Sequence, residues 1–528
     1  MAALLVLGAW LRLRHSTTAF LFGDELHSLR LLALPYRDLF ATFDMQGSSF
    51  ALPILQKAAI DLLGARLVAL RLPAILPGIA TLCLLPCAGR RLVSPTGALF
   101  ATALLATSTF HVFYSGFGRS YSLIALIALL VVIAATRVLA DVRPGPGPYA
   151  ALAVTGGVLP WVHLETSTFV LAVAVTTVVA AALLPNQRRR VPFLLLAFGA
   201  SAALAVALLF PDWPHVFEYV ARKHHDGAAR FGLTDAATVL AGSATGGLVL
   251  IALVPLGAAL VVQRLGAARV PLAVAALAQL PIVFALEPFG GPYAFARYCT
   301  AALPAAALVC GELLAWIAAL ARVDRAAPWS AVLLGGALAL VGPLEMTDDG
   351  PYANTYLSLA PLPAFDVAFP AMPEAYRRLE PNALIVEAPA IEDKSRQLYR
   401  NYYLQHRRPT LIGYLPEDGP TPPGPHVAIG PPWDLEKRAD YLVLHRDVAS
   451  EVDRYWHFVY QEALPRVGGA TSLMHQLANF DRTNGRLTLR RPTAETLAVL
   501  GRRYGPPLYE DASVVVYRLR RPHVAPTP

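Results

Sequence analysis

Three arginines and an acidic pair carry most of the chemistry that this sequence offers. Asp24 and Glu25 stand side by side in FGDELHS, directly after the first apolar run. Arg71, Arg119 and Arg297 each lie near the start of a later apolar run. Guanidinium groups hold phosphate through two parallel hydrogen bonds. A carboxylate at a bilayer boundary costs free energy unless it is hydrated, paired with a cation or required for function. These residue types predict a polar cavity that binds an anion.

Four more polar residues accompany the arginines. His163 and Glu165 lie in PWVHLETS, between two apolar runs, and Tyr121 and Tyr298 closely follow two of the arginines in RSYS and ARYC. Each position is at the boundary of a predicted span, so we expect these side chains to line the same cavity.

Lys57 lies in SFALPILQKAAIDLLG, a pattern that predicts a helix along the membrane surface. The residues expected to face lipid are Phe50, Ile54, Leu55 and Leu62. Lys57 could join the anion-binding cluster, or it could form an ordinary surface pair with Asp61 at the i, i+4 spacing.

Each candidate residue also has an ordinary structural explanation. Arg71 and Arg119 could extend toward lipid phosphate from the ends of their helices. His163 and Glu165 could satisfy helix ends in a polar seam. The acidic pair could begin the next helix, where negative charge is favoured, although this explains one carboxylate more easily than two.

The elements that position these residues are membrane helices. Of 528 residues, 55% are hydrophobic and only 15% are charged, with a mean hydropathy of +0.49, which is typical of an integral membrane protein. Apolar runs near the length needed to cross a bilayer continue to about residue 346. Eleven spans are predicted, over residues 3–21, 67–88, 96–114, 120–140, 149–162, 164–184, 191–210, 236–262, 270–286, 296–320 and 328–346.

Arginine placement predicts the orientation of these spans. Alternate loops, GRRLVSPTG, RVLADVRPGPG, PNQRRRVP, QRLGAAR and ARVDRAAP, are rich in arginine and are assigned to the cytoplasm. The loop at 22–66, with its acidic motif and amphipathic helices, then faces outward, as does everything after residue 346. We expect a bacterial inner (plasma) membrane protein whose membrane domain (1–346) precedes an extracytoplasmic domain (347–528).

The second predicted domain is water-soluble and of the α/β class. Short apolar runs suited to strands, ALIVEAP, PTLIGY, DYLVLH and SVVVYRL, alternate with helical stretches such as PEAYRRL and TAETLAVLGRRYG. This order favours a sheet with at least partly parallel strands. No catalytic constellation is predicted in it.

Several motifs, taken in their order along the chain, resemble those of one known family. The acidic pair in the first outer loop, ALRLPA, YSGFGRSYSL, WVHLETS and ARYCTAALP are similar to polyprenyl-phosphate-sugar-dependent glycosyltransferases of the GT-C fold. The nearest groups are bacterial relatives of the protein O-mannosyltransferases, of the family 39 type, and the aminoarabinose transferases of lipid A. Where members often carry His-Pro-Pro or Lys-Pro-Pro after the acidic pair, this chain reads DMQGSSFALP.

The resemblance implies transfer of a sugar from a polyprenyl-phosphate donor to an extracytoplasmic glycan, lipid or protein, with inversion. Because the phosphate leaves as a stable anion, one base is enough, in contrast to the two carboxyls of glycosidases. Asp24 would be that base, and Glu25 would orient the loop or bind the acceptor or a cation. The donor phosphate would be bound by Lys57, Arg71, Arg119 and Arg297, and the cavity would be completed by Tyr121, His163, Glu165 and Tyr298.

Other partners and functions are weighed against this one. No cofactor and no metal site is predicted, although a divalent cation stays open, and the net charge of +8 is spread over short loops rather than gathered on a face for nucleic acid. A transporter or flippase would also need a polar cavity, but its charges belong at the midplane and its spans usually repeat. The third hypothesis is a non-catalytic relative with the same fold.

Overall fold

The computed structural model describes two compact units, which are treated separately. It describes residues 1–13, 25, 28–32, 34–43, 49–64, 67–225, 233–242, 244–279, 296–321, 329–331, 333–334, 372–389, 399, 402, 406, 408, 410–413, 429–430, 439–447 and 492–519. The first unit takes its described residues from Met1–Ser28, Tyr36–Pro363 and Gly469–Leu473, and the second from Leu29–Pro35, Ala364–Gly468 and Met474–Pro528. The predicted boundary at residue 346 lies outside the described residues and stays a prediction.

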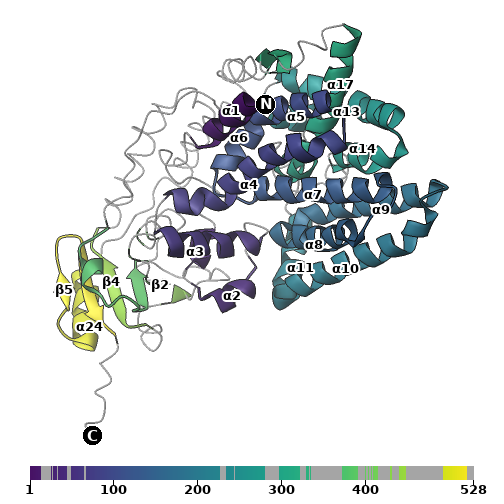
Figure 1. Cartoon of the computed structure of the whole chain (residues 1–528). Coiled ribbons are helices and arrows are strands. Elements are labelled where there is room, and N and C mark those ends of the chain that lie inside the picture. The colour runs from purple at the N-terminus through teal and green to yellow at the C-terminus, as the bar shows by residue number, and fades with distance from the viewer. Residues whose placement is uncertain are drawn as a thin grey trace. The chain divides into compact units, whose positions relative to one another are not determined.

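The first unit is a bundle of helices (Figure 1). Its main helices are α1 (Ala2–Leu13), α2 (Tyr36–Phe40), α3 (Ala51–Leu63), α4 (Leu67–Ala88), α5 (Pro95–Thr107), α6 (Thr109–Gly116), α7 (Tyr121–Ala140), α8 (Pro146–Val162), α9 (Ser167–Leu183), α10 (Val191–Leu209), α11 (Trp213–His225), α12 (Leu233–Ala241), α13 (Ala244–Leu265), α14 (Val270–Leu277) and α17 (Leu303–Leu320). Helix α8 packs between α7 and α10, while α17 packs against α5 and α13.

Several of these helices are long and apolar enough to cross a membrane. In the described part of the chain there are six such helices, or seven if the pair α5 and α6, bent by 59°, is one span. A membrane protein is therefore supported, but the predicted count of eleven spans is not confirmed. The predicted span at 67–88 coincides with α4, and the one at 120–140 with α7. The predicted span at 96–114 is instead broken at Ser108.

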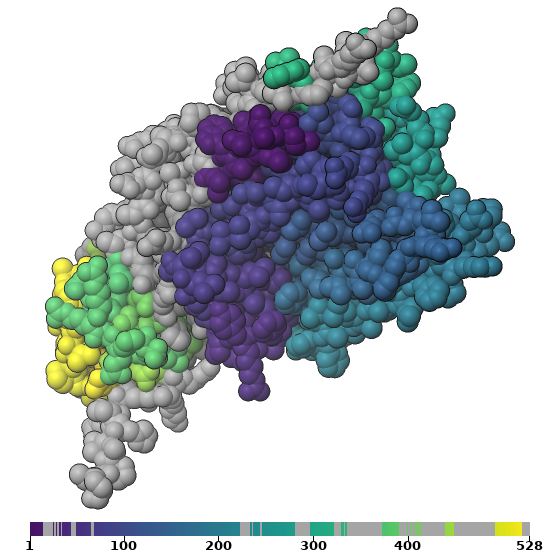
Figure 2. Space-filling model, viewed as in Figure 1, coloured from purple at the N-terminus to yellow at the C-terminus, as the bar shows by residue number. Residues whose placement is uncertain are grey.

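The surface of α9 and α10 has the character expected of lipid-facing helices (blue in Figure 2). Leu171, Val175, Leu195 and Leu196 are all exposed.

The predicted position of helix α3 at a surface is only partly confirmed. Leu55 and Leu62 are exposed as expected, but Phe50 and Ile54 pack inside the protein and do not face lipid.

Charged side chains from two other helices hold both ends of α5. At its N-terminus, the buried carboxylate of Glu312 accepts hydrogen bonds from the backbone N–H of Ser94 at 2.8 Å and from its hydroxyl at 2.6 Å. At the other end, the buried guanidinium of Arg12 donates to the carbonyls of Leu105 at 2.9 Å and Ala106 at 3.1 Å. Acid at the start and a cation at the end match the helix dipole. Carbonyls at the end of a helix lack a helical partner, and at the break after α5 Arg12 supplies the missing donor.

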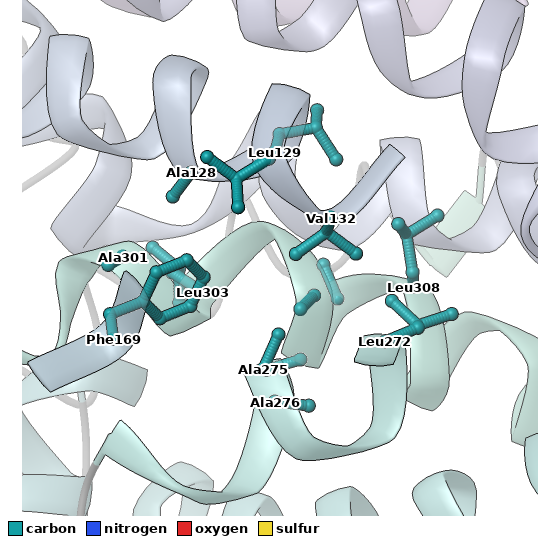
Figure 3. Packing of buried hydrophobic residues seen from close by; sticks show 14 of the residues in the cluster. Ala128, Leu129, Val132, Phe169, Leu272, Ala275, Ala276, Ala301, Leu303 and Leu308 are labelled. Atoms are coloured by element: carbon teal, nitrogen blue, oxygen red, sulfur yellow. The ribbon is translucent and has the colours of Figure 1, made fainter. Parts of the chain in front are cut away.

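Helix α17 lies in the centre of the apolar packing. Figure 3 shows side chains of α7, α9 and α14 meeting those of α17 and of the turn before it, with Leu129, Phe169, Leu272 and Leu308 among them. Small residues allow the close approach of α17 to its neighbours. A Cβ on Gly311 would lie 2.3 Å from the carbonyl oxygen of Gly97 in α5.

The second unit contains a six-stranded sheet in its described residues (green to yellow in Figure 1). The strands are β1 (Ile385–Ala388), β2 (Thr410–Gly413), β3 (Ile429–Gly430), β4 (Tyr441–His445), β5 (Tyr509–Glu510) and β6 (Val514–Arg518), in the order β3-β2-β1-β4-β6-β5. The four strands β3, β2, β1 and β4 are parallel, and β6 and β5 are antiparallel additions. The predicted strands and their partly parallel arrangement are confirmed.

Both faces of this sheet are covered, as a parallel sheet requires. Ile385 packs on one face with Tyr376 of α19 (Ala375–Arg378), and Val386 packs on the other with Leu500 of α24 (Ala494–Tyr504). This explains why β1 reads as a continuous apolar run interrupted only by Glu387.

The contact between α5 and α17 predicts a strong effect of one methyl group. Gly311→Ala should lower the thermal unfolding midpoint, because the new Cβ meets backbone atoms of Gly97 and Ala101 that cannot turn aside, at a cost of about 1–3 kcal/mol. The matched control is Gly199→Ala, since nothing lies within 4 Å of a Cβ at Gly199. Equal midpoints for the two variants in detergent would contradict this packing.

Candidate functional site

The acidic pair is tied to α4 through Glu25. Its carboxylate accepts two hydrogen bonds from Arg71, from Nε and Nη2, both at 2.8 Å. Both side chains are buried, with exposed fractions of 0% and 2%. A third bond to Glu25 comes from the backbone N–H of Gly118 at 2.7 Å. The carboxylate thereby joins α4 to the turn that leads into α7.

Gly118 fits this place because it has no side chain. A Cβ would lie 3.0 Å from Oε1 of Glu25 and 3.4 Å from Nε2 of Gln56. Gln56, buried on α3, donates from Nε2 to the carbonyls of Leu70 and Gly118, both at 3.1 Å. Three separate segments therefore converge on this turn.

Next to the turn lies a cluster of rings and one cation. Tyr121, the first residue of α7, has its ring 5.7 Å from that of His163 at the end of α8, and His163 lies 5.8 Å from Tyr298. The guanidinium carbon of Arg297 lies 5.9 Å from the centre of the Tyr121 ring, within cation–π range. The structure thus brings together four of the predicted residues from three parts of the chain.

Arg119 connects the two groups along the chain. It directly follows Gly118 and precedes Tyr121 by two residues, and its side chain is buried. The start of α4, the start of α7, the end of α8 and the segment before α17 therefore meet at one end of the bundle.

Gln279 is a positioning residue that the sequence did not reveal. It is buried, and its Nε2 donates to the carbonyl of Tyr298 at 3.1 Å and to the hydroxyl of Thr168 at 3.3 Å. Thr168 in turn donates to the carbonyl of Glu165 at 2.9 Å. Glu165 is thereby linked to the cluster through backbone and side-chain contacts.

Of the two remaining predicted residues, one lies outside the described structure and the other belongs to a separate surface group. Asp24 lies outside the described residues, although its neighbour Glu25 is fixed. Lys57 lies over the ring of Tyr36, 5.4 Å from its centre, in a surface group with Asp61. The hydroxyl of Tyr36 donates to Asp61 at 2.8 Å, and partial burial followed by this bond raises the pKa of Tyr36 to about 12.

An apolar groove begins beside the cluster. Cys299, next to Tyr298, lines a hollow of about 240 Å³ together with residues of α12, α13, α14 and α17. A second hollow of about 360 Å³ shares Leu240, Leu250, Leu303 and Ala306 with it and continues along α17 to Leu314. The groove is therefore long, mostly apolar and adjacent to a polar end.

A buried polar cluster in the second unit was missed by the sequence analysis. The hydroxyl of Tyr376 donates to Glu387 of β1 at 2.5 Å and lies 3.0 Å from Nε2 of His445 at the end of β4. The ring of His406 stacks on Tyr376 at 4.7 Å. Glu387 and His445 are fully buried. The signal that could have found them is a titratable residue inside each otherwise apolar strand.

Burial sets the protonation of this cluster. It raises the pKa of Tyr376, as does the charge of Glu387. Burial, and then the charge of Arg408, lowers the pKa of His406 to about 3. His406 lies 3.9 Å from Glu387, beyond hydrogen-bond distance.

No metal centre is evident in the part of the chain that the structure describes. Within those residues, no three side chains of His, Cys, Asp or Glu are grouped to hold an ion.

Removal of the Glu25 carboxylate should destabilise the first unit. In Glu25→Ala the buried guanidinium of Arg71 keeps its charge without this counter-charge, which costs about 3–5 kcal/mol. Lys57→Ala is the control, because Lys57 is only partly buried. Thermal unfolding in detergent should show a large loss only for the first variant, and Glu25→Ala with Arg71→Met should recover part of it. A small loss for Glu25→Ala alone would contradict the clamp.

His406 should make the second unit sensitive to acid. Its pKa is about 3 in the fold and about 6.5 when unfolded, so the unfolded state binds the additional proton as the pH falls. Stability is then lost between these two pH values, by up to about 1.4 kcal/mol per pH unit. Amide hydrogen exchange of β1 and β4, corrected for intrinsic rates, measures this loss. In His406→Gln the pH dependence should be weaker, and an unchanged slope would exclude His406 as its source.

Comparison with known proteins gives a likeness in structure only. No family model and no curated protein matches the chain. The crystal structure of ArnT from Cupriavidus metallidurans in the apo state has a TM-score of 0.54 at 14% identity, over 98% of this chain and 97% of ArnT. The structure of ArnT bound to undecaprenyl phosphate has the same score and identity, over 86% and 93%.

An oligosaccharyltransferase from Archaeoglobus fulgidus in the apo form is a weaker match, with a TM-score of 0.47 at 14% identity, over 88% of this chain and 71% of that one. At such low identity the comparison with ArnT concerns the arrangement of helices and not the activity. The chain has the GT-C fold that ArnT represents.

Proposed function

We propose that this protein is a membrane glycosyltransferase that takes a sugar from a polyprenyl-phosphate donor. The observation that carries the proposal is the meeting of Arg297 with Tyr121, His163 and Tyr298 at one end of the bundle, where the apolar groove begins. The buried Arg119 lies two residues before Tyr121. A polyprenyl phosphate has matching parts, an anionic head and a long apolar tail.

The structural relative supports this choice of donor. ArnT has been crystallised with undecaprenyl phosphate, a lipid of this chemical class. In our proposal the groove along α17 holds isoprenoid units, because its lining from Cys299 to Leu314 is mostly apolar. The guanidinium groups beside it would neutralise the phosphate as it leaves.

The residues are assigned different parts in the transfer. Asp24 accepts the proton of the acceptor hydroxyl or amine as general base. Arg71 uses Nε and Nη2 on Glu25, so we assign this pair to holding the acidic segment in place. Phosphate binding falls to Arg119 and Arg297. Lys57 stands at the periphery of the site.

Three remaining features of the proposal are those that the resemblance of the sequence motifs to the glycosyltransferase family implies. They are inversion at the anomeric carbon, a hexosyl or pentosyl donor, and an acceptor that is a glycan, a lipid or a protein. The arginine-rich loops favour the inner membrane of a bacterium, with the second unit on the extracytoplasmic side.

The test uses the full chain in liposomes that contain undecaprenyl-phosphate sugars, with a panel of glycan, lipid and peptide acceptors. We expect transfer by the natural chain and a loss of about 10²–10⁴-fold in Asp24→Asn. Arg297→Gln should weaken binding of undecaprenyl phosphate itself, measured in nanodiscs.

The control is Lys57→Gln, which should bind undecaprenyl phosphate nearly as well as the natural chain. Transfer that survives Asp24→Asn unchanged would remove the base from the proposal. Movement of lipid between leaflets without transfer would favour a flippase.

A further inference from the structure

Three exposed arginines lie at the end of α7 that is opposite to the candidate site. Arg188 and Arg189 belong to the turn between α9 and α10, and Arg143 belongs to the turn between α7 and α8. Helix α7 begins in the candidate site at Tyr121 and runs for 20 residues, or about 30 Å, which is close to the hydrocarbon thickness of a bilayer. These three arginines are called the loop patch.

A fourth arginine joins the two turns that carry the loop patch. Arg190 donates from Nη2 to the carbonyls of Asp141 at 2.8 Å and Val142 at 2.9 Å, and from Nη1 to the carbonyl of Val138. These carbonyls lie at the end of α7, where helical partners are lacking. The turn after α9 is thereby held beside the turn after α7, so the loop patch is formed by neighbouring segments.

The loop patch has no acidic counterpart among the residues that the structure describes. Asp141 is the one carboxylate in the two turns, and it is paired with Arg137, whose Nε lies 3.3 Å from its Oδ2. Arg188 donates to the carbonyl of Ala182 at 3.0 Å. Within the described part of the chain, no carboxylate pairs with any member of the loop patch, so its charges are available to an anion.

Exposed apolar side chains adjoin the loop patch. Leu183, the last residue of α9, is 72% exposed, while Phe193 and Leu196 in the first turns of α10 are 60% and 71% exposed. The ring of Phe193 lies 6.0 Å from that of Tyr149 in the first turn of α8, and these helices lie side by side in Figure 1. An acidic protein or a nucleic acid would have no use for apolar groups at this place. A phospholipid needs both parts, because its headgroup is anionic and its acyl chains are apolar.

We propose that the loop patch binds the headgroup of an anionic phospholipid whose acyl chains lie against Leu183, Phe193 and Leu196. Arginine suits this role because its guanidinium group holds a phosphate through two parallel hydrogen bonds. A bias of positive charge toward one side is common to membrane proteins. The apolar side chains beside the loop patch, and the lack of a described counter-charge, point further, to a bound lipid. This inference does not depend on the proposed function.

The experiment measures lipid binding to the full chain by native mass spectrometry, with phosphatidylglycerol as the anionic probe and phosphatidylcholine as the neutral one. The natural chain should bind phosphatidylglycerol more tightly. The combined variant Arg143→Gln, Arg188→Gln and Arg189→Gln should weaken this binding about a hundredfold, from about fivefold for each arginine. Binding of phosphatidylcholine should stay within twofold. Glycerol phosphate, which has the anionic group without the chains, should not compete.

The matched control is the combined variant Arg90→Gln, Arg91→Gln and Arg264→Gln. These arginines are exposed and lie at the same end of the bundle, where Arg269 donates to the carbonyl of Arg91 at 2.9 Å. No large apolar side chain within four residues of them is exposed. The control removes the same charge without touching the proposed site, so it should weaken phosphatidylglycerol binding less than tenfold. In phosphatidylcholine, both variants should unfold at the same midpoint as the natural chain.

Three results would overturn the inference. They are equal affinity of the natural chain for the two phospholipids, an equal loss in the two combined variants, and a lower unfolding midpoint of the loop-patch variant in phosphatidylcholine. Arg297→Gln separates this inference from the proposed function, because it should weaken binding of undecaprenyl phosphate and leave phosphatidylglycerol unchanged. If the natural chain does not bind undecaprenyl phosphate, the proposed function fails, and the comparison of the two phospholipids still decides this inference.

Discussion

The site depends on one buried ion pair. Glu25 holds the acidic segment against Arg71 of α4 and against the N–H of Gly118, so three segments far apart in sequence keep one arrangement. Removal of one partner from such a pair is costly, because the other charge remains buried. The same contact sets the turn that carries Arg119 and starts α7 at Tyr121. The position of the candidate phosphate-binding residues therefore depends on an ion pair that takes no direct part in the proposed transfer.

Charges elsewhere in the first unit also do structural work. Glu312 and Arg12 lie among apolar helices, and each is directed at one end of α5, where the backbone supplies the complementary groups. A charged side chain inside a membrane usually suggests function. These two show that a helix terminus can be one partner of a buried charge, and Arg12 also contacts Gly8 and His111. Arg297 at the candidate site differs from them, because it lies beside the ring of Tyr121.

The sequence predicted the general architecture, but not the contacts within the candidate site. The length of the apolar runs predicted α4 and α7. The alternation of strands and helices predicted the partly parallel sheet, because both features follow from local patterns. The pairing of Glu25 with Arg71 could not be read, because both had plausible partners at the same end of the bundle. Phe50 and Ile54 were assigned to lipid, since an apolar helix face looks the same whether lipid or protein covers it. The His445 and Glu387 cluster depends on the register between two strands, which no local pattern encodes.

The arrangement of the sheet in the second unit has a consequence for association between copies. In the described residues, the strands at its two edges, β3 and β5, are only two residues long, whereas the central strand β4 has five. An exposed edge offers unpaired backbone groups to any neighbouring chain, and a short edge offers few of them. The short edges thereby limit the pairing of this sheet with the sheet of a second copy.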